Sequence, residues 1–353
     1  MNKIRLAVIF GGKSTEHEVS LVSGSAVINA ADKEKYDIVP VGITKAGEWR
    51  LYKGLEGASG AAFDSAIQAI KTGKWTADSE PIDPWKLPEI CDFALPILHG
   101  KNGEDGTIQG LFELLGIPYG GCGVLGSATA MDKTVAKKIF ESEGLRQAPY
   151  VDFTSAEIGQ PVIERINREL KYPLFVKPVN LGSSVGITKV TEPEELLPAI
   201  EYAKGFDRRF CVEQAVNKAR ELEISVMGND DLFLGRVGEI VPRQAFYTYD
   251  AKYNDDSSEL LIPAPISPDE EWKIRKMASA AYKALGCCGF ARCDFLMDGD
   301  THEIYINEIN TIPGFTEISM FPKLCIAAGM TYPQVIDRIV ELGYERYNAE
   351  NNR

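Results

Sequence analysis

The sequence has no extended run of lysine and arginine, no apolar run as long as a membrane span, and no Cys-x-x-Cys pair. Without a basic run, a chain of net charge −13 is not expected to bind nucleic acid. The missing apolar run predicts no membrane partner, and since residues 1–6 lead straight into a strand pattern we expect no signal peptide. The seven cysteines are scattered and odd in number, which indicates free thiols in a reducing cytoplasm.

Two familiar nucleotide-binding patterns are also missing where they would be needed. The sequence contains no GxxxxGK[ST] phosphate loop, and the turn after its first strand, Gly-Gly-Lys-Ser-Thr, lacks GxGxxG spacing. A dehydrogenase of the dinucleotide-binding type would need that spacing there, so we exclude this class. An acidic protein that binds a polyanion must use isolated cations or a metal ion, so its single lysines become informative.

What is present predicts an α/β protein of two or three domains, because the chain has 353 residues and an apolar fraction of 44%. Residues 4–10 form a continuous apolar run, the pattern of a buried parallel strand. A helix at 19–31 and a strand at 36–44 complete a β–loop–α–β unit, which predicts a doubly wound parallel sheet. We expect a further strand at 93–98, a helix at 107–115, and an exposed, variable segment at 46–90.

The composition changes near residue 122, and we divide the chain into residues 1–122, 123–211 and 212–353. The middle part predicts a helix at 127–144, strands at 174–178 and 209–216, and a helix at 193–203 with Thr191 and Glu194 as its capping box. The last part predicts strands at 221–227 and 232–240 and helices at 269–285 and 332–343. The polar, tyrosine-rich stretch 246–258 has no period, which is typical of a lid or a disordered tip.

A β-hairpin is predicted at 290–297 and 303–310, because Asp-Gly-Asp turn formers separate two strand patterns. Alternation places Arg292 and Asp294 on one face of the first strand, and Glu308 and Asn310 on one face of the second. If the two faces coincide, three oxygen-bearing groups crowd one spot, and such hard ligands suit Mg²⁺ with substrate phosphates. The alternative is a solvated polar face.

A Gly/Ser loop at 181–186 follows the predicted strand that carries Lys177. Glycines let a backbone approach a phosphate, serines add donors, and a lysine beside such a loop makes a phosphate clamp. Lys133, on the preceding predicted helix, is a second candidate. The alternatives are an ordinary tight turn and a surface lysine.

Other candidates lie at strand ends and in loops. The segment Glu213-Gln214-Ala215-Val216 could accept a hydrogen bond from an adenine amino group and offer its backbone to the ring, although many strands end in this way. Glu221 and Glu223 share a strand face, where one could bind a ribose hydroxyl or both could be solvated. His99 follows an α/β strand, where ligands bind, and Glu16 or Glu18 could cap a helix or hold a substrate ammonium.

Six segments, spread over essentially the whole chain, form a recognisable set: VIFGGKSTEHEVSL, LHGKNGEDGTIQGLFELLGIPYGG, Met131-Asp132-Lys133, FVKPVNLGSSVGITKV, FYTYDAKY and ARCDF…INEINTIPGFTEISMFPKL. In these segments the chain resembles the D-alanine–D-alanine ligases of the ATP-grasp fold. The resemblance implies a Rossmann-like first domain, a small central ATP-grasp domain and a C-terminal ATP-grasp domain. It also implies an ATP-dependent cytoplasmic enzyme of peptidoglycan synthesis, commonly a homodimer.

The resemblance also implies roles for single residues. Two Mg²⁺ ions, with Mn²⁺ as a substitute, would lie on Asp294, Glu308 and Asn310. ATP would be bound by Lys133, Lys177, Ser183, Ser184, Glu213, Gln214, Ala215, Val216, Glu221 and Lys252, although Glu221 lies one residue farther from Glu213 than is common. The first D-alanine would meet Glu16, with His99 near it, and the oxyanion would meet Arg292 and Gly314. Ser319 and Met320 would face the second substrate, while Tyr253 would reach Ser183 and Glu16 when the lid closes.

The implied reaction phosphorylates the first D-alanine to an acyl phosphate, which the amine of the second D-alanine attacks. One segment departs from the family pattern, which is commonly Ser-His-Ser-Leu but here is Glu317-Ile318-Ser319-Met320. D-Serine-using relatives tend to have Arg where Met320 stands, and D-lactate-using relatives have His where Tyr253 stands. We therefore expect D-alanine as second substrate and D-serine as the alternative. A nucleotide-binding protein without turnover would lack the metal carboxylates, and an ATP-grasp carboxylase would have no reason to keep HGKNGEDG and FYTYDAKY.

Overall fold

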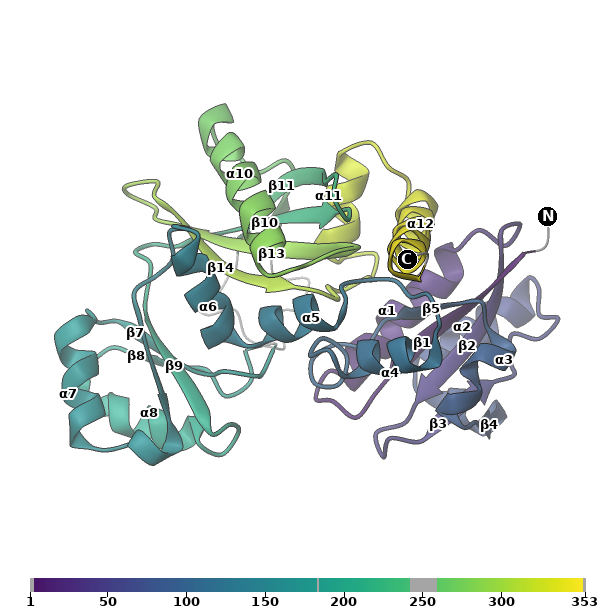
Figure 1. The fold of residues 1–353 in the computed structure, drawn as a ribbon, viewed down its shortest axis with the longest axis horizontal. Helices are drawn as coiled ribbons and strands as arrows, with labels where there is room; N and C mark the ends of the chain where they lie inside the picture. The colour runs from purple at the N-terminus through teal and green to yellow at the C-terminus, as the bar shows by residue number, and fades with distance from the viewer. Residues whose placement is uncertain (1–2, 183, 242–258, 352–353) are drawn as a thin grey trace.

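The computed structural model describes residues 3–182, 184–241 and 259–351. Figure 1 shows three domains in chain order, the first in purple and blue, the second in teal, and the third in green and yellow. Each domain is built on its own sheet. Within the described residues, no helix combines the length and the apolar character that crossing a membrane would need.

The first domain contains the predicted β–α–β unit, which is confirmed. β1 (Ile4–Gly11) lies between β2 (Tyr36–Ile43) and β5 (Phe93–Pro96) and runs parallel to both. Both faces of β1 are covered, since Leu6, Val8 and Phe10 belong to one apolar cluster and Ala7 and Ile9 to another. This explains why the strand is a continuous apolar run. The helices are α1 (His17–Ala30), α2 (Ala61–Lys71), α3 (Leu87–Ile90) and α4 (Thr107–Leu115).

The segment 46–90 is exposed or half-buried along most of its length, as predicted, and it also contains regular elements. β3 (Trp49–Tyr52) and β4 (Ser79–Pro81) extend the first sheet as antiparallel strands, and the short helices η1 (Lys74–Asp78) and η2 (Pro84–Lys86) flank β4. Trp75 is 1% exposed, and its ring lies where a Cβ on Gly42 would be only 2.2 Å away. The sequence did not predict η1, because one aromatic residue among polar neighbours has no periodicity.

The second sheet has the order β6-β9-β7-β8, and its neighbouring strands are antiparallel. Its strands are β6 (Tyr150–Thr154), β7 (Leu174–Pro178), β8 (Thr188–Val190) and β9 (Arg209–Gln214), and its helices are η3 (Ser155–Glu157), α7 (Gln160–Glu169), η4 (Pro193–Glu195) and α8 (Leu196–Ala203). Glu192 and Glu195 form the capping box at η4, so the predicted box of Thr191 and Glu194 was wrong by one residue.

Two helices, α5 (Val124–Met131) and α6 (Lys133–Ser142), replace the single helix predicted at 127–144. Asp132 breaks the pattern with an extended backbone, φ −82° and ψ 99°, and its carboxylate accepts the N–H groups of Thr134 and Val135. An aspartate at this N-cap position satisfies donors that a continuous helix would not leave open. The two helices contribute to the apolar core of the third domain, with Phe140 fully buried there.

The third sheet has the order β12-β11-β10-β13-β14, again with antiparallel neighbours. Its strands are β10 (Arg220–Met227), β11 (Phe233–Val241), β12 (Glu259–Leu261), β13 (Phe290–Met297) and β14 (Ile304–Asn310), and its helices are α10 (Pro268–Ala284), α11 (Met320–Ala327) and α12 (Tyr332–Asn351). Figure 1 shows α12 beside the first domain. Val335, Ile336 and Ile339 of α12 share an apolar cluster with Phe93 and Phe290, so this helix joins the first and third domains.

Candidate active site

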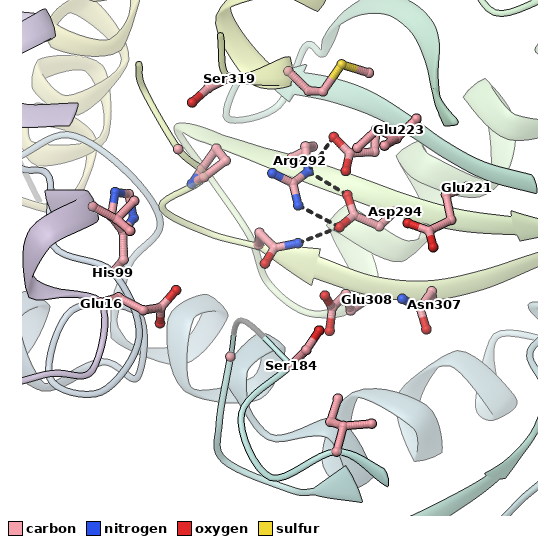
Figure 2. A pocket seen from close by; sticks show the side chains of 18 of the residues that line it. Glu16, His99, Ser184, Glu221, Glu223, Arg292, Asp294, Asn307, Glu308 and Ser319 are labelled. Carbon is pink, nitrogen blue, oxygen red and sulfur yellow. Dashed lines mark hydrogen bonds and ion pairs between the residues drawn. The ribbon is translucent and has the colours of Figure 1, made fainter. Parts of the chain in front are cut away.

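A cleft of about 1970 Å³ lies where the three domains meet. All predicted site residues that the structure describes line it, and they come from every domain: Glu16, His99, Lys133, Lys177, Ser184, Glu213, Gln214, Ala215, Val216, Glu221, Arg292, Asp294, Glu308, Asn310, Gly314, Ser319 and Met320. Figure 2 shows Glu16 and His99 on one side of the cleft and the β13–β14 hairpin on the other. Ser183, Lys252, Tyr253 and the proposed lid 246–258 lie outside the described residues.

The hairpin register confirms that the two polar faces coincide. Arg292 is paired with Asn310, and Asp294 with Glu308, across the β13–β14 ladder. The Arg292 Nε lies 2.7 Å from Asp294 Oδ1, and Asn310 Nδ2 donates to Asp294 Oδ2 at 2.9 Å (Figure 2). The side chains of Arg292 and Asp294 are only 19% and 13% exposed, which excludes the solvated-face alternative for them.

These groups fit a hard divalent cation as a donor set. Two carboxylates, Asp294 and Glu308, and the amide of Asn310 share one face, and Mg²⁺ binds through one or two carboxylates together with substrate phosphates. Among the described residues, no cluster of three or more His, Cys, Asp or Glu side chains forms a metal site. With two carboxylates and one amide, the face offers the partial donor set that suits a cation sharing its ligands with a nucleotide.

A second acid, Glu223 on β10, holds the guanidinium of Arg292. Its Oε2 lies 2.9 Å from Arg292 Nε, and the ladder pairs Glu223 with Asp294. Glu223 is 7% exposed, so the prediction that it could be solvated was wrong. Figure 2 shows Glu221 on the same strand, facing the cleft beside Asp294. Two carboxylates thus hold Arg292 in the wall of the cleft, which restricts the rotamers of its side chain and fixes the direction of its remaining N–H donors.

On the wall formed by the second sheet, two lysines surround a buried glutamate. Glu213 Oε2 lies 2.8 Å from Lys177 Nζ, and its Oε1 lies 3.5 Å from Lys137 Nζ. Burial would raise the pKa of Glu213, but the charges of Lys137 and Lys177 outweigh it and lower that pKa to about 2. Lys137 could not be recognised from the sequence as part of this wall, because a lysine on an amphipathic helix carries no signal that it is buried.

The Gly/Ser loop lies between this wall and the first domain. Lys133 Nζ donates to Leu181 O at 2.7 Å and lies 3.9 Å from Glu308 Oε2, so one lysine connects the loop to the hairpin. A Cβ on Gly182 would be 3.2 Å from Glu16 Oε2, so the loop passes directly beside that carboxylate. The arrangement brings the backbone of Leu181 and Gly182 close to both the predicted phosphate and amino-acid sites.

The two acids of the first strand–helix loop differ in surroundings. Glu16 is 5% exposed and occupies the N-cap position of α1 without a side-chain cap hydrogen bond, so the capping alternative is wrong for it. Glu18 forms a surface ion pair with Lys45, where the Glu18 side chain is 60% exposed. A Cβ on Gly100 would be 2.3 Å from Glu16 Oε2, so glycine at 100 leaves room for the Glu16 carboxylate.

Two further groups beside Glu16 have shifted pKa values. Burial lowers the pKa of His99, which keeps the ring neutral at pH 7. Burial, with the nearby charge of Glu16, raises the pKa of Glu104 to about 8. Glu104 also lines the cleft, and the sequence reasoning missed it although it lies in the HGKNGEDG segment. That segment was the available signal, but it did not show which of its acids faces inward.

Ser319 and Met320, which follow the hairpin, have different surroundings. The Ser319 hydroxyl accepts the Thr316 N–H at 3.0 Å, and a Cβ on Gly314 would be 2.8 Å from that hydroxyl. Met320 is 5% exposed and belongs to a small apolar cluster with Ile240 and Leu324. Met320 therefore offers the cleft an apolar surface and no hydrogen-bond donor.

Known proteins are similar to this chain in sequence and in fold. The family described as "D-ala D-ala ligase N-terminus" matches residues 5–122, and "D-ala D-ala ligase C-terminus" matches residues 139–341. D-Alanine–D-alanine ligases from Ruminiclostridium cellulolyticum and Caldicellulosiruptor bescii are 48% and 46% identical, each aligned over 98% of this chain and over 97% and 96% of their own lengths.

Two solved structures are similar over nearly the whole chain. The VanG D-Ala:D-Ser ligase from Enterococcus faecalis has a TM-score of 0.86 at 40% identity, covering 97% of this chain and 100% of that one. The D-alanine–D-alanine ligase from Coxiella burnetii has a TM-score of 0.86 at 31% identity, covering 100% and 97%. The chain therefore belongs to the D-alanine–D-alanine ligase family and has the ATP-grasp fold that its sequence predicted.

Proposed function

We propose that this protein joins two D-alanine molecules into D-alanyl-D-alanine with hydrolysis of ATP to ADP and phosphate, as a step of peptidoglycan precursor synthesis. Family membership over the full chain supports the overall reaction. The observation that carries it is the shared face of Arg292, Asp294, Glu308 and Asn310, which lies in one cleft with Lys177 and Glu16. One cleft thus offers groups for a metal-bound triphosphate and for an ammonium.

For the nucleotide, we assign the triphosphate to Lys133, Lys177 and the loop that contains Ser184, since both lysines line the cleft. Glu213 to Val216 would contact adenine and Glu221 the ribose, because all of them line the same cleft. Asp294, Glu308 and Asn310 would hold Mg²⁺, or Mn²⁺ in its place, which would neutralise phosphate charge when bound. Two ions, and the roles of Ser183 and Lys252, stay predictions.

The chemistry requires two steps. The carboxylate of the first D-alanine attacks the γ-phosphorus of ATP, and ADP leaves, which forms an acyl phosphate. The amine of the second D-alanine then attacks the acyl carbon, loses a proton and expels phosphate. Because water would hydrolyse the acyl phosphate, the cleft must close during turnover, which is the predicted task of segment 246–258 and of Tyr253.

The chain's own groups would orient the reacting atoms. Glu16, buried beside Gly100, would hold the ammonium of the first D-alanine. Arg292, fixed by Glu223 and Asp294, and the backbone N–H of Gly314 would stabilise the oxyanion of the second step. A well-placed donor of this kind contributes on the order of 3 kcal/mol in comparable sites.

For the second substrate we favour D-alanine. Met320 packs in an apolar cluster and offers no partner to a serine hydroxyl, so burial of that hydroxyl would leave it unsatisfied. D-Serine remains the second candidate, because the VanG D-Ala:D-Ser ligase is 40% identical to the chain. A homodimer and a cytoplasmic location also stay predictions.

The test is a product assay with purified protein and MgATP. We expect phosphate release with D-alanine alone, and a dipeptide whose mass is that of D-alanyl-D-alanine. Addition of equimolar D-serine or D-lactate should change the product only slightly. ATP binding without phosphate release would instead indicate a nucleotide-binding protein without turnover, and a dominant mixed product would reassign the second substrate.

A further inference from the structure

The segment that follows β14 is held by side chains of the first domain. Ile312 lies there, and both of its backbone polar groups have partners about 200 residues earlier in the chain: Glu104 Oε1 accepts its N–H at 3.2 Å, and His99 Nδ1 donates to its carbonyl at 2.9 Å. Glu104 also accepts the N–H of Gly100 through Oε2 at 2.8 Å. One carboxyl group therefore connects a loop of the first domain to the segment beyond the hairpin.

A third side chain, Ser23 on α1, extends this contact. His99 Nδ1 must donate to a carbonyl, so its Nε2 accepts from the Ser23 hydroxyl at 3.1 Å. The same hydroxyl accepts the N–H of Phe315 at 3.3 Å. Ser23 is fully buried and His99 is 4% exposed, so water cannot readily replace these bonds. The donors and acceptors are thus consistent with a single ring tautomer.

We infer that Ser23, His99 and Glu104, which we name the latch, are positioning residues that set the backbone of Gly314 for the ligation step. Their partners Ile312 and Phe315 stand on either side of Pro313-Gly314, and Pro313 limits the freedom left between them. The inference rests on the proposed function, in which the Gly314 N–H faces the oxyanion. Displacement of a reacting group by about 1 Å can lower a rate by about 100-fold.

The latch orients the segment but does not hold it alone. The Phe315 ring packs on Phe290 and Phe321, at centroid distances of 5.5 and 5.2 Å, from the side of the third domain. This aromatic contact would persist if a latch bond were lost. Loss of the latch should therefore loosen the Gly314 backbone while the segment stays folded, which makes the role testable.

The test measures phosphate released per dipeptide formed. If the Gly314 amide is misplaced, the amine attacks slowly and water hydrolyses the acyl phosphate, so the ratio rises above one. We expect Ser23→Ala and Glu104→Gln to raise the ratio to about two or more and to lower dipeptide kcat by about tenfold, with KM for ATP nearly unchanged. In Glu104→Gln one amide oxygen cannot accept both N–H groups.

Ser20→Ala is the matched control. Ser20 is a fully buried serine on the same helix, and it accepts the N–H of Gly11 and donates to the carbonyl of Ile97, both within the first domain. Its loss removes two comparable hydrogen bonds without touching residues 312–315, so the ratio should stay at one. Should Glu104→Gln fail to fold, Ser23→Ala, which removes a single hydroxyl, decides the question.

Two results would overturn the latch. The first is that Ser23→Ala and Glu104→Gln release one phosphate per dipeptide and have the same kcat as Ser20→Ala. The hydrogen bonds of Ser23 and Glu104 to the segment 312–315 would then be merely structural. The other is a wild-type protein that forms no dipeptide, which would refute the proposed function first and is seen before any variant is compared. Uncoupled phosphate release confined to the latch variants would support the assignment.

Discussion

Lys137 should stabilise the folded protein more than an exposed lysine on the same helix does. Its Nζ lies 3.5 Å from Glu213 Oε1, and the two side chains are 3% and 5% exposed. At an effective dielectric constant of about 20, unit charges at this separation attract by roughly 4 to 5 kcal/mol. Replacement of Lys137 by Met keeps the length of the side chain and removes the cost of burying the ammonium, while Glu213 keeps Lys177 at 2.8 Å. We therefore expect a net loss of about 2 kcal/mol in the free energy of unfolding.

The neighbouring Lys138 supplies the control for this experiment. It lies on the same helix and pairs with Asp152 at 2.7 Å, but its side chain is 58% exposed. Exposed pairs of this kind contribute about 0 to 1 kcal/mol, so Lys138→Met should change stability little. The assay is equilibrium urea unfolding of both variants at pH 7. Equal losses, within about 0.5 kcal/mol, would refute the reasoning.

The same pair has a pH signature. The folded pKa of Glu213 is lowered to about 2, below its value in the unfolded chain. A lowered carboxyl pKa stabilises the fold above the unfolded pKa, and this stabilisation is lost as pH falls through the folded pKa. In Lys137→Met one of the two cations is gone, so the pKa of Glu213 in the folded protein should rise toward its value in the unfolded chain. The stabilisation that ionised Glu213 provides should then be lost over a narrower pH range. Unfolding free energies between pH 3 and pH 7 measure this, and parallel profiles for wild type and variant would contradict it.

Three further results are expected at the cleft. Glu308→Gln should abolish phosphate release. Its control is Glu303→Gln, at an exposed position that pairs with Arg146 at the other end of the hairpin, which should leave phosphate release unchanged. Near-normal turnover of Glu308→Gln at low Mg²⁺ would show that Glu308 does not bind the metal. Gly100→Ala should raise KM for D-alanine at least about tenfold because its Cβ would lie 2.3 Å from Glu16, while Gly144→Ala, with a similar φ of +66° and open space around it, should show only backbone strain of about 1 kcal/mol. Mg²⁺ should bind weakly by itself and tightly with an ATP analogue, as calorimetry would show, since the hairpin offers two carboxylates; tight binding of Mg²⁺ alone would contradict the shared-ligand arrangement.

Periodicity explains what could be predicted. Alternation was sufficient to pair Arg292 with Asp294 on one face of β13, and Glu308 with Asn310 on one face of β14. It did not decide that the two faces coincide, because the ladder shifts register by a β-bulge between Asp294 and Phe295, which brings Glu308 opposite Asp294. The apolar run of β1 likewise predicted a strand buried on both faces. Alternation and apolar runs depend on neighbours within a few residues, so one sequence contains the information they need.

The predictions of secondary structure failed where one side chain decides the local structure. Asp132 ends one helix and begins another, although the surrounding residues continue a helical period. Trp75 fills the space above Gly42 from a segment without periodicity. In both cases a side chain interacts with a group that the local sequence does not specify.

The sequence by itself determined the first β–α–β unit, the two strands of the hairpin, and the segments by which the chain resembles the ligase family. Only the tertiary structure decided which groups meet across the cleft. Glu104 and Ile312 are 208 residues apart, and Ser23 and Phe315 are 292 apart. Contacts at such separations depend on how three sheets pack, and no local spacing records that packing. The pKa shifts of Glu213 and Glu104 were equally hidden, because burial and neighbouring charge exist only after the domains have met.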